Sequence, residues 1–286
     1  MEGVMMRGSK SMAVAVRQPD DQVIIHTEDL NPHIYTGRIS KIPFLRALTS
    51  LWDVLVLGIR TLMFSAEVAL GEEEEVEFSG PVAWGTVAVS FILGIGLFFV
   101  VPLLIVGFID RFIASSVLSN IIEGAIRMAL FIGYIWLIGR VPDIRRVFGY
   151  HGAEHKTINA YEAGADLTPD SVAQYSTRHY RCGTAFLLSV MVISILVFSL
   201  LGRPPMGLRI LSRIVLIPVV AGIAYEWIKF TARHRTNPII RTISAPNLAL
   251  QGLTTREPDR SMLEVAISAL KRVLESEGGD LPAESS

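Results

Sequence analysis

Residues 82–109 read VAWGTVAVSFILGIGLFFVVPLLIVGFI and contain no ionisable side chain. Folded as an α-helix, with a rise of about 1.5 Å per residue, this stretch is longer than the hydrocarbon core of a bilayer, which is about 30 Å thick. It therefore predicts a membrane-spanning helix, and this prediction decides the fold class of the chain.

The composition of the whole chain agrees with a membrane protein. Of its 286 residues, 51% are hydrophobic and 19% are charged, and the mean hydropathy is +0.46. A soluble domain of this length usually carries more charge. The formal net charge is −1, so no general positive field attracts nucleic acid. We therefore expect the lipid bilayer, and not nucleic acid, as a partner; other membrane proteins and a second copy of the chain stay open as further partners.

Three other apolar segments predict further spans, which makes the fold a mainly α-helical, polytopic membrane bundle. These segments cover residues 113–138, 185–201 and 208–231. Residues 43–70 also have a helical pattern, but charged side chains recur on one face at intervals of about seven residues. Such a helix is typical of the membrane interface or of the side of a bundle. The sequence thus predicts four spans, and a fifth crossing at 43–70 stays open.

Polar side chains share one face of the second predicted span, which sets it apart from the first. They are Ser116, Asn120, Glu123 and Arg127, at spacings of four, three and four residues. Ionisable groups at membrane depth face a bundle interior or water, and Glu123 and Arg127 are one helical turn apart and can pair. Two interpretations stay open: a packing face that satisfies its own polar groups, or a polar cavity inside the bundle.

The distribution of basic residues predicts an orientation in the membrane. Lys and Arg are concentrated in the segment 139–183 and after residue 231, whereas the short turns on the opposite side hold Arg111 and Arg203. The positive-inside rule then places the segment 139–183 and both termini in the cytoplasm.

The N-terminal element, residues 1–42, predicts a cytoplasmic β-hairpin. Two β-prone runs at 12–16 and 22–26 flank the turn signal Pro19-Asp20-Asp21, and this arrangement is typical of two paired strands. The membrane bundle follows as residues 43–231.

The C-terminal cytoplasmic tail, residues 232–286, predicts a short amphipathic helix. Apolar residues recur at helical spacing between Met262 and Leu270. We expect Ser261 to be the N-cap and Glu264 to complete a capping box.

The segment 139–183 holds the candidate catalytic residues. His151, Glu154 and His155 form the pattern H-x-x-E-H. Residues four apart on a helix point the same way, so both histidines can reach one metal ion. In inverted zinc proteases this pattern supplies two zinc ligands and a glutamate that acts as general base on bound water. The pattern therefore predicts Glu154 as the catalytic residue and zinc as the cofactor.

A second pair, His179 and Cys182, completes the predicted set of metal ligands. Imidazole and thiolate both suit zinc, and Glu162 on the same predicted helix as His151 and His155 is another candidate. Four protein ligands would form a closed, structural site, whereas three ligands and water would form a catalytic one. A polar network of the same segment without metal is the remaining interpretation.

Four short motifs, taken together, resemble one family over nearly the whole chain. They are EGVMMRG at 2–8, YHGAEHKTIN at 150–159, RCGT at 181–184 and LTTREP at 253–258. With these motifs the chain resembles the YqhQ-like bacterial membrane proteins, which are defined as a domain of unknown function. The resemblance implies a multi-pass protein of the bacterial inner membrane and a metal-dependent enzyme, and it names no substrate.

The sequence leaves two main functions open. One is a membrane-embedded, zinc-dependent hydrolase, which requires Glu154. The other is a non-enzymatic scaffold or membrane-protein assembly factor, in which the histidine segment is a docking platform held together by metal or hydrogen bonds. A third interpretation is a transporter that uses the polar face of the second span, although the chain has no visible internal repeat to support it.

Overall fold

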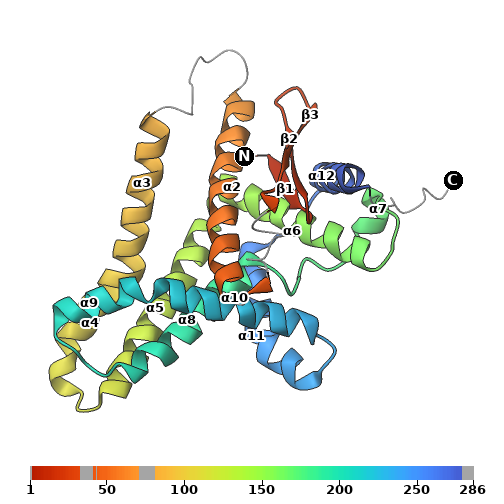
Figure 1. The fold of residues 1–286 in the computed structure, drawn as a ribbon. Helices are drawn as coiled ribbons and strands as arrows, with labels where there is room; N and C mark the ends of the chain where they lie inside the picture. The colour runs from red at the N-terminus through yellow and green to blue at the C-terminus, as the bar shows by residue number, and fades with distance from the viewer. Residues whose placement is uncertain (1, 33–40, 43, 71–80, 279–286) are drawn as a thin grey trace. The chain divides into compact units, whose positions relative to one another are not determined.

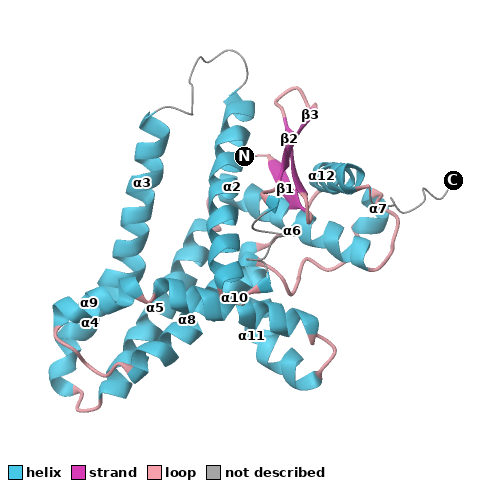
Figure 2. Cartoon of the chain, in the orientation of Figure 1, coloured by secondary structure: helices cyan, strands magenta, loops and turns pink. Residues whose placement is uncertain are grey.

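The fold was analysed in a computed structural model that describes residues 2–32, 41, 42, 44–70 and 81–278. Helices predominate in this part of the chain, and three strands form one small sheet (Figure 1, Figure 2). The chain forms two compact units. We call them the sheet unit, which comprises Met1–Phe78, Gly139–His179 and Gln251–Ser286, and the helical unit, which comprises Ser79–Ile138 and Tyr180–Leu250.

The sheet unit contains an antiparallel sheet in the order β1-β2-β3, with strands Gly3–Arg7, Ser11–Arg17 and Val23–Asp29. The predicted hairpin is confirmed as β2 and β3, in which Val14 pairs with His26. Its turn contains Asp21 at a φ of 66°, a conformation that aspartate tolerates better than most residues. Strand β1 was not predicted, and it pairs with the other edge of β2.

Strand β2 is buried on both faces, so it forms the centre of this unit. Its small residues Ala13 and Ala15 belong to one apolar core with α6 and α12. Its larger residues Val14 and Val16 belong to a second core with Leu57 of α2. The helices of the unit are α2 (Leu45–Leu70), α6 (Pro142–Glu162), α7 (Pro169–Val172) and α12 (Arg260–Glu277).

The predicted N-cap of α12 is wrong by two residues. The Asp259 carboxylate accepts a hydrogen bond from the backbone N–H of Met262 at 2.9 Å, and the hydroxyl of Ser261 donates to the same carboxylate at 2.6 Å. Asp259 takes this position because its extended backbone lies three residues before Met262, at the distance from which a cap reaches. The helix ends at Gly278 with a φ of 68°, the left-handed conformation that glycine adopts without strain.

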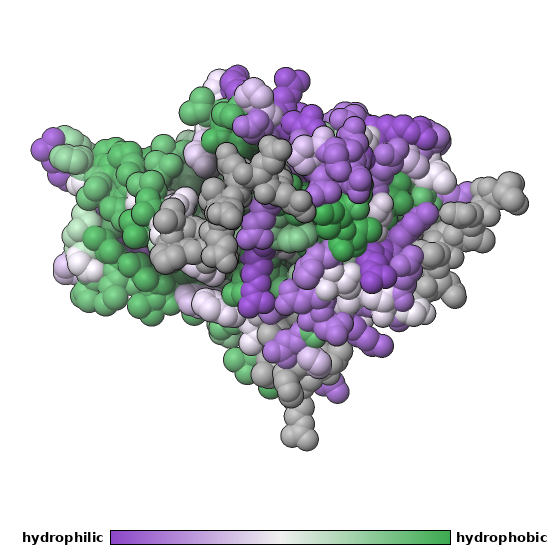
Figure 3. All heavy atoms as spheres, turned by 90° about the horizontal axis from the view of Figure 1, so that it is seen from above, coloured by the Kyte–Doolittle hydropathy of each residue, from purple (hydrophilic) through white to green (hydrophobic). Residues whose placement is uncertain are grey.

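The helical unit contains the most apolar helices of the described chain. Within the described residues, four helices are long and apolar enough to cross a membrane, namely Leu45–Val68, Trp84–Phe112, Ser116–Ile138 and Gly183–Leu200. The last three lie in this unit and match the predicted segments 82–109, 113–138 and 185–201. The first is α2, the segment whose crossing the sequence left open. Figure 3 shows a broad hydrophobic surface (green) on the side where α3 lies in Figure 1.

The fourth predicted span, 208–231, is two helices instead of one. The helices α9 (Met206–Val215) and α10 (Ile217–Arg233) meet at Leu216 with a bend of 42°. Pro218 lies in the first turn of α10, where its missing N–H leaves no intrahelical hydrogen bond unmade. The other helices of the unit are α3 (Pro81–Ile95), α4 (Val101–Ile109), α5 (Ser116–Ile138), α8 (Gly183–Leu200) and α11 (Pro238–Thr254), whose last turn belongs to the sheet unit.

Candidate functional site

Helix α6 presents His151 and His155 on one face, as the H-x-x-E-H pattern predicts. Their ring centroids are 4.4 Å apart. His155 is fully buried and His151 is half-buried. Glu154, the predicted general base, is half-buried on the same helix, directly before His155. The structure therefore brings two predicted zinc ligands side by side.

Backbone carbonyl oxygens fix the orientation of both imidazole rings. The His151 Nδ1 atom lies 2.9 Å from the carbonyl oxygen of Thr254, and the His155 Nδ1 atom lies 2.6 Å from that of Thr177. A carbonyl oxygen can only accept, so each Nδ1 carries the proton of these hydrogen bonds. A neutral ring then keeps its lone pair on Nε2, which is the atom that a metal would bind.

His179 joins these two histidines within the sheet unit. Its ring centroid is 5.8 Å from that of His155, and its Nε2 atom lies 3.4 Å from the Glu162 Oε1 atom. Glu162, which the sequence offered as a third ligand, therefore lies beside His179. We call His151, Glu154, His155, Glu162 and His179 the histidine site.

Gln251 holds the backbone at His179 from both sides, and the sequence analysis missed it. The His179 N–H donates to Gln251 Oε1 at 2.9 Å, and Gln251 Nε2 donates to the His179 carbonyl oxygen at 2.7 Å. The side chain of Gln251 is fully buried, so both bonds are shielded from water. Gln251 lies just before the LTTREP motif, and that adjacency is the signal that could have marked it.

Two further side chains of α6 fasten the segment that carries Thr177 and His179. Lys156 Nζ donates to the Ala173 carbonyl oxygen at 2.6 Å and forms an ion pair with Glu257. Asn159 Nδ2 donates to the carbonyl oxygens of Ser176 and Arg178 at 2.7 and 3.0 Å. The polar residues of the YHGAEHKTIN motif thus hold the loop after α7 against α6.

Gly152 allows the LTTREP motif to approach α6. A Cβ atom at this position would overlap the carbonyl oxygen of Arg256. The Arg256 N–H donates to the Phe148 carbonyl oxygen at 2.8 Å. This close contact positions Thr254, whose carbonyl oxygen accepts the hydrogen bond from His151. A residue without a Cβ atom at position 152 therefore allows the backbone approach that orients His151.

The EGVMMRG motif anchors β1 to the same helix. Glu2 binds Arg146 through two hydrogen bonds of 2.5 and 2.6 Å and accepts a third from the Tyr150 hydroxyl at 2.9 Å. The hydrogen bond from Arg146 lowers the pKa of Glu2 below its usual range. Burial, together with the hydrogen bond to Glu2, raises the pKa of Tyr150. Three of the four motifs therefore meet at α6.

Cys182 belongs to the helical unit, unlike the predicted histidine ligands. It is the N-cap of α8, where its buried Sγ atom accepts a hydrogen bond from the Thr184 N–H at 3.3 Å. This cap gives the RCGT motif a structural role. The part of Cys182 in metal binding stays a sequence-based prediction.

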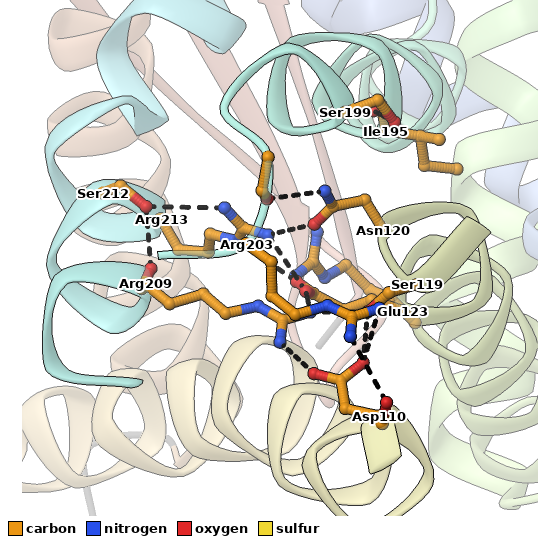
Figure 4. A network of polar contacts seen from close by, with 12 residues as sticks. Asp110, Ser119, Asn120, Glu123, Ile195, Ser199, Arg203, Arg209, Ser212 and Arg213 are labelled. Carbon is orange, nitrogen blue, oxygen red and sulfur yellow. Dashed lines mark hydrogen bonds and ion pairs between the residues drawn. The ribbon is translucent and has the colours of Figure 1, made fainter. Parts of the chain in front are cut away.

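A second polar site lies inside the helical unit around Glu123, whose side chain is 2% exposed (Figure 4). Arg127 Nη2 lies 2.8 Å from Glu123 Oε1, and the Nη2 atoms of Arg209 and Arg213 each lie 3.0 Å from Glu123 Oε2. Figure 4 shows Arg209 and Arg213 extending from α9 toward this carboxylate. We call the network the arginine cluster; it comprises Asp110, Ser119, Asn120, Glu123, Arg127, Arg203, Arg209 and Arg213.

The predicted polar face of the second span contributes three of its four residues to this cluster. Asn120 accepts from Arg213 Nη2 at 2.7 Å and donates to the Gly202 carbonyl oxygen at 3.0 Å, while Ser116 lies outside the cluster at the start of α5. Ser119, Arg209 and Arg213 were missed. The four-residue spacing of the two arginines in an apolar segment was the available signal.

Arg127 also compensates for a proline in the neighbouring helix. Pro102 has no N–H to donate to the Phe98 carbonyl oxygen four residues earlier. The Arg127 Nε atom donates to that oxygen at 2.8 Å. A π-helical turn, Gly96–Val100, precedes this proline, so the polar residue of α5 stabilises an irregular stretch of an otherwise apolar helix.

The comparisons with known proteins define the family of this chain. The family described as "Protein of unknown function (DUF1385)" matches residues 42–276. A relative from Bacillus subtilis (strain 168), "Uncharacterized protein YqhQ", is 33% identical over 289 residues, which cover 97% of this chain and 91% of the relative. No solved structure matches. The chain belongs to the DUF1385 family, and the resemblance to YqhQ-like proteins is confirmed.

Proposed function

We propose that this protein is a multi-pass protein of the bacterial inner membrane whose sheet unit carries a zinc-dependent hydrolytic site on the cytoplasmic side. The spans would be α3 with α4, α5, α8, and the bent pair α9 and α10. Their exposed apolar side chains, such as Phe108, Leu196 and Ile214, support contact with lipid. Four spans leave both termini on one side, which the distribution of Lys and Arg assigns to the cytoplasm.

Helix α2 would lie at the membrane interface and not cross. Leu57, near its middle, packs in the core beneath β2. The Thr61 hydroxyl contacts Met5 Sδ at 3.3 Å, and Arg60 pairs with Glu28 of β3 at 3.2 Å. A sheet with charged edge residues stays in water, so a helix whose C-terminal half is attached to it is held at the surface.

The observation that carries the zinc site is the pair of Nδ1–H hydrogen bonds to the Thr177 and Thr254 carbonyls. With Nδ1 protonated, a neutral ring carries its lone pair on Nε2, and imidazole nitrogen with carboxylate oxygen is a donor set that suits zinc. Zinc, when bound, supplies a water molecule with a lowered pKa. His151 and His155 would bind the ion, and Glu154 would accept the proton of that water as general base.

Zinc-loaded protein in lipid nanodiscs, incubated with a mixed peptide pool and followed by mass spectrometry, tests this proposal. The wild type should hydrolyse a subset of peptides, and Glu154→Gln should keep its zinc while losing at least about a hundredfold in rate. Glu275→Gln, an exposed glutamate of α12 in the same unit, is the matched control and should retain activity. Equal rates in the wild type and Glu154→Gln would exclude this mechanism.

A specific observation also favours the scaffold function. His155, Asn159, Lys156 and Gln251 all hold the backbone of residues 173–179, so the polar residues around the histidines have a structural use without any reaction. If this is their purpose, Glu154→Gln should leave every property unchanged, whereas Asn159→Ala should expose the loop to proteolysis. Two results together would favour the scaffold function over the hydrolase: the wild type hydrolyses no peptide, and the Asn159→Ala variant is sensitive to protease.

A further inference from the structure

The arginine cluster contains more positive than negative charge. Glu123 and Asp110 face Arg127, Arg203, Arg209 and Arg213, so four guanidinium groups share two carboxylates. Arginine does not lose its proton in proteins. The remaining acidic residue of the helical unit is Glu226, and even with its charge included the positive groups are in excess.

This excess lies where charge is costly. The side chains of Arg127, Arg209 and Arg213 are at most 3% exposed, and an uncompensated buried charge costs several kcal/mol. The geometry around them is otherwise complete, because Arg213 and Arg127 also lie over the Phe198 ring at 4.2 and 5.8 Å. The cluster is therefore well packed, but it contains too little negative charge to balance its arginines.

One donor of the cluster is unused. Arg209 Nη1 donates to Asp110 at 2.6 Å, and Nη2 donates to Ser119 and Glu123. The Arg209 Nε atom is buried and has no hydrogen-bond partner within the described ranges. Buried donors without a partner are rare in folded proteins, so this N–H points to an acceptor that the described residues do not supply.

Two short turns meet at one end of the cluster, beside Asp110 and Arg203. Arg203 bridges them, since its Nη2 donates to the carbonyl oxygens of Ile113 and Ser115 at 2.9 and 3.1 Å. Its side chain is 28% exposed and also pairs with Asp110. Leu200, Phe112 and other large apolar side chains around these turns are exposed, so the partly exposed Arg203 lies among apolar surface residues.

The reversed polarity of α9 extends this surface. Arg209 and Arg213 are buried, whereas Leu208, Leu211 and Ile214 of the same helix are exposed. A helix with this pattern places its arginines inside the bundle and its apolar side against lipid.

We propose that the arginine cluster binds a phosphate group, carried by a membrane lipid whose acyl chains lie along the apolar surface of α9. A phosphate oxygen would accept from Arg209 Nε and from Arg203, and its charge would compensate the excess of guanidinium groups. The proposal uses only residues of the helical unit and does not depend on the zinc site.

Binding to the full-length protein in non-ionic detergent tests this proposal. The probes are dioctanoyl phosphatidylglycerol, dioctanoylglycerol, which lacks the phosphate, and inorganic phosphate. At about ten times its Kd, phosphatidylglycerol should raise the melting temperature by about 3–6 °C, and dioctanoylglycerol should not. Inorganic phosphate that protects equally would identify a free anion as the ligand; protection by dioctanoylglycerol alone would overturn the proposal.

Three variants separate binding from folding. Arg209→Gln and the more exposed Arg203→Gln should each weaken phosphatidylglycerol binding at least about tenfold, because each removes a charge-assisted donor. Arg241→Gln, an exposed arginine of α11 in the same unit, is the control and should bind as the wild type does. If Arg209→Gln does not fold, the affinity of Arg203→Gln for phosphatidylglycerol tests the proposal instead. Wild-type affinity in Arg203→Gln would contradict the proposal.

Discussion

The histidine site and the arginine cluster are both polar, but they are held in different ways. In the histidine site, backbone carbonyl oxygens and the amide of Gln251 hold the histidine rings and the backbone between them. In the arginine cluster, ionised side chains hold one another. The difference teaches that backbone and amide groups fix the histidine rings and the chain around them, whereas the arginine cluster uses most of its donors internally and is left with a surplus of positive charge.

The two units also differ in their overall charge. The sheet unit contains sixteen basic and twenty-four acidic residues, and the helical unit contains ten basic and three acidic residues. The formal net charge of −1 hides this division. An acidic unit that attracts cations and a basic unit that attracts anions fit the two proposals of a metal site and a phosphate site.

Removal of Glu123 should give the largest effect, because it leaves three buried arginines without their shared carboxylate. We expect Glu123→Ala to lower the free energy of unfolding by about 3–5 kcal/mol, measured by thermal unfolding in detergent. Ser116→Ala, on the same helix but outside the cluster, should change it by less than about 0.5 kcal/mol. Similar melting temperatures for Glu123→Ala and Ser116→Ala would show that the cluster is not held by this carboxylate.

A methyl group at Gly152 should damage the histidine site through the backbone. Gly152→Ala forces the Arg256 carbonyl away from α6 and should cost about 1–3 kcal/mol. It should also weaken zinc binding about tenfold, since the Thr254 carbonyl moves with the same segment. Gly58→Ala on α2, where an added Cβ meets no atom within 4 Å, is the control and should leave zinc binding unchanged.

Loss of the Gln251 amide should release His179. Gln251→Ala removes two buried hydrogen bonds and should cost about 1–3 kcal/mol, and the His179 amide should lose its protection in hydrogen exchange. Gln251→Glu keeps the acceptor for the His179 N–H, so this amide should stay protected while stability still falls. Unchanged exchange in Gln251→Ala would contradict the role of this clamp.

The ion pair of Glu2 and Arg146 should have the smallest effect, because both groups are partly exposed and screened by water. The folded-state pKa of Glu2 is lowered, chiefly by the hydrogen bond from Arg146. The contribution of ionised Glu2 to the free energy of unfolding is therefore fully present above the unfolded-state pKa of about 4.3. It is lost as the pH falls through the lower folded-state pKa. Glu2→Gln should lower stability at pH 7 by about 1 kcal/mol or less, and the difference should vanish in acid unfolding below about pH 3.

The sequence predicted what is local or periodic. The H-x-x-E-H spacing placed His151 and His155 together, the hairpin turn lay where Asp20 and Asp21 predicted it, and the apolar run at 82–109 was found as a long helix. Each of these predictions depends on neighbours within a few turns of the chain, where period and turn chemistry determine the structure.

The sequence could not predict partners that lie far apart in the chain. Gln251 meets His179 across a separation of 72 residues, and Arg213 meets Glu123 across 90. No periodic signal links such positions. The bend at Leu216 was missed for another reason, because hydropathy alone does not distinguish one span with a proline from two shorter helices.

The zinc content of the full-length protein tests the central claim, that two imidazoles fixed by backbone carbonyl oxygens form a metal site. Equilibrium dialysis against zinc, followed by elemental analysis, should give about one ion per chain for the wild type and for a His26→Ala, His234→Ala variant, in which two exposed histidines are removed. The His151→Ala, His155→Ala variant should bind none. Equal zinc content in this variant and the wild type, or a wild type without zinc, would contradict the account.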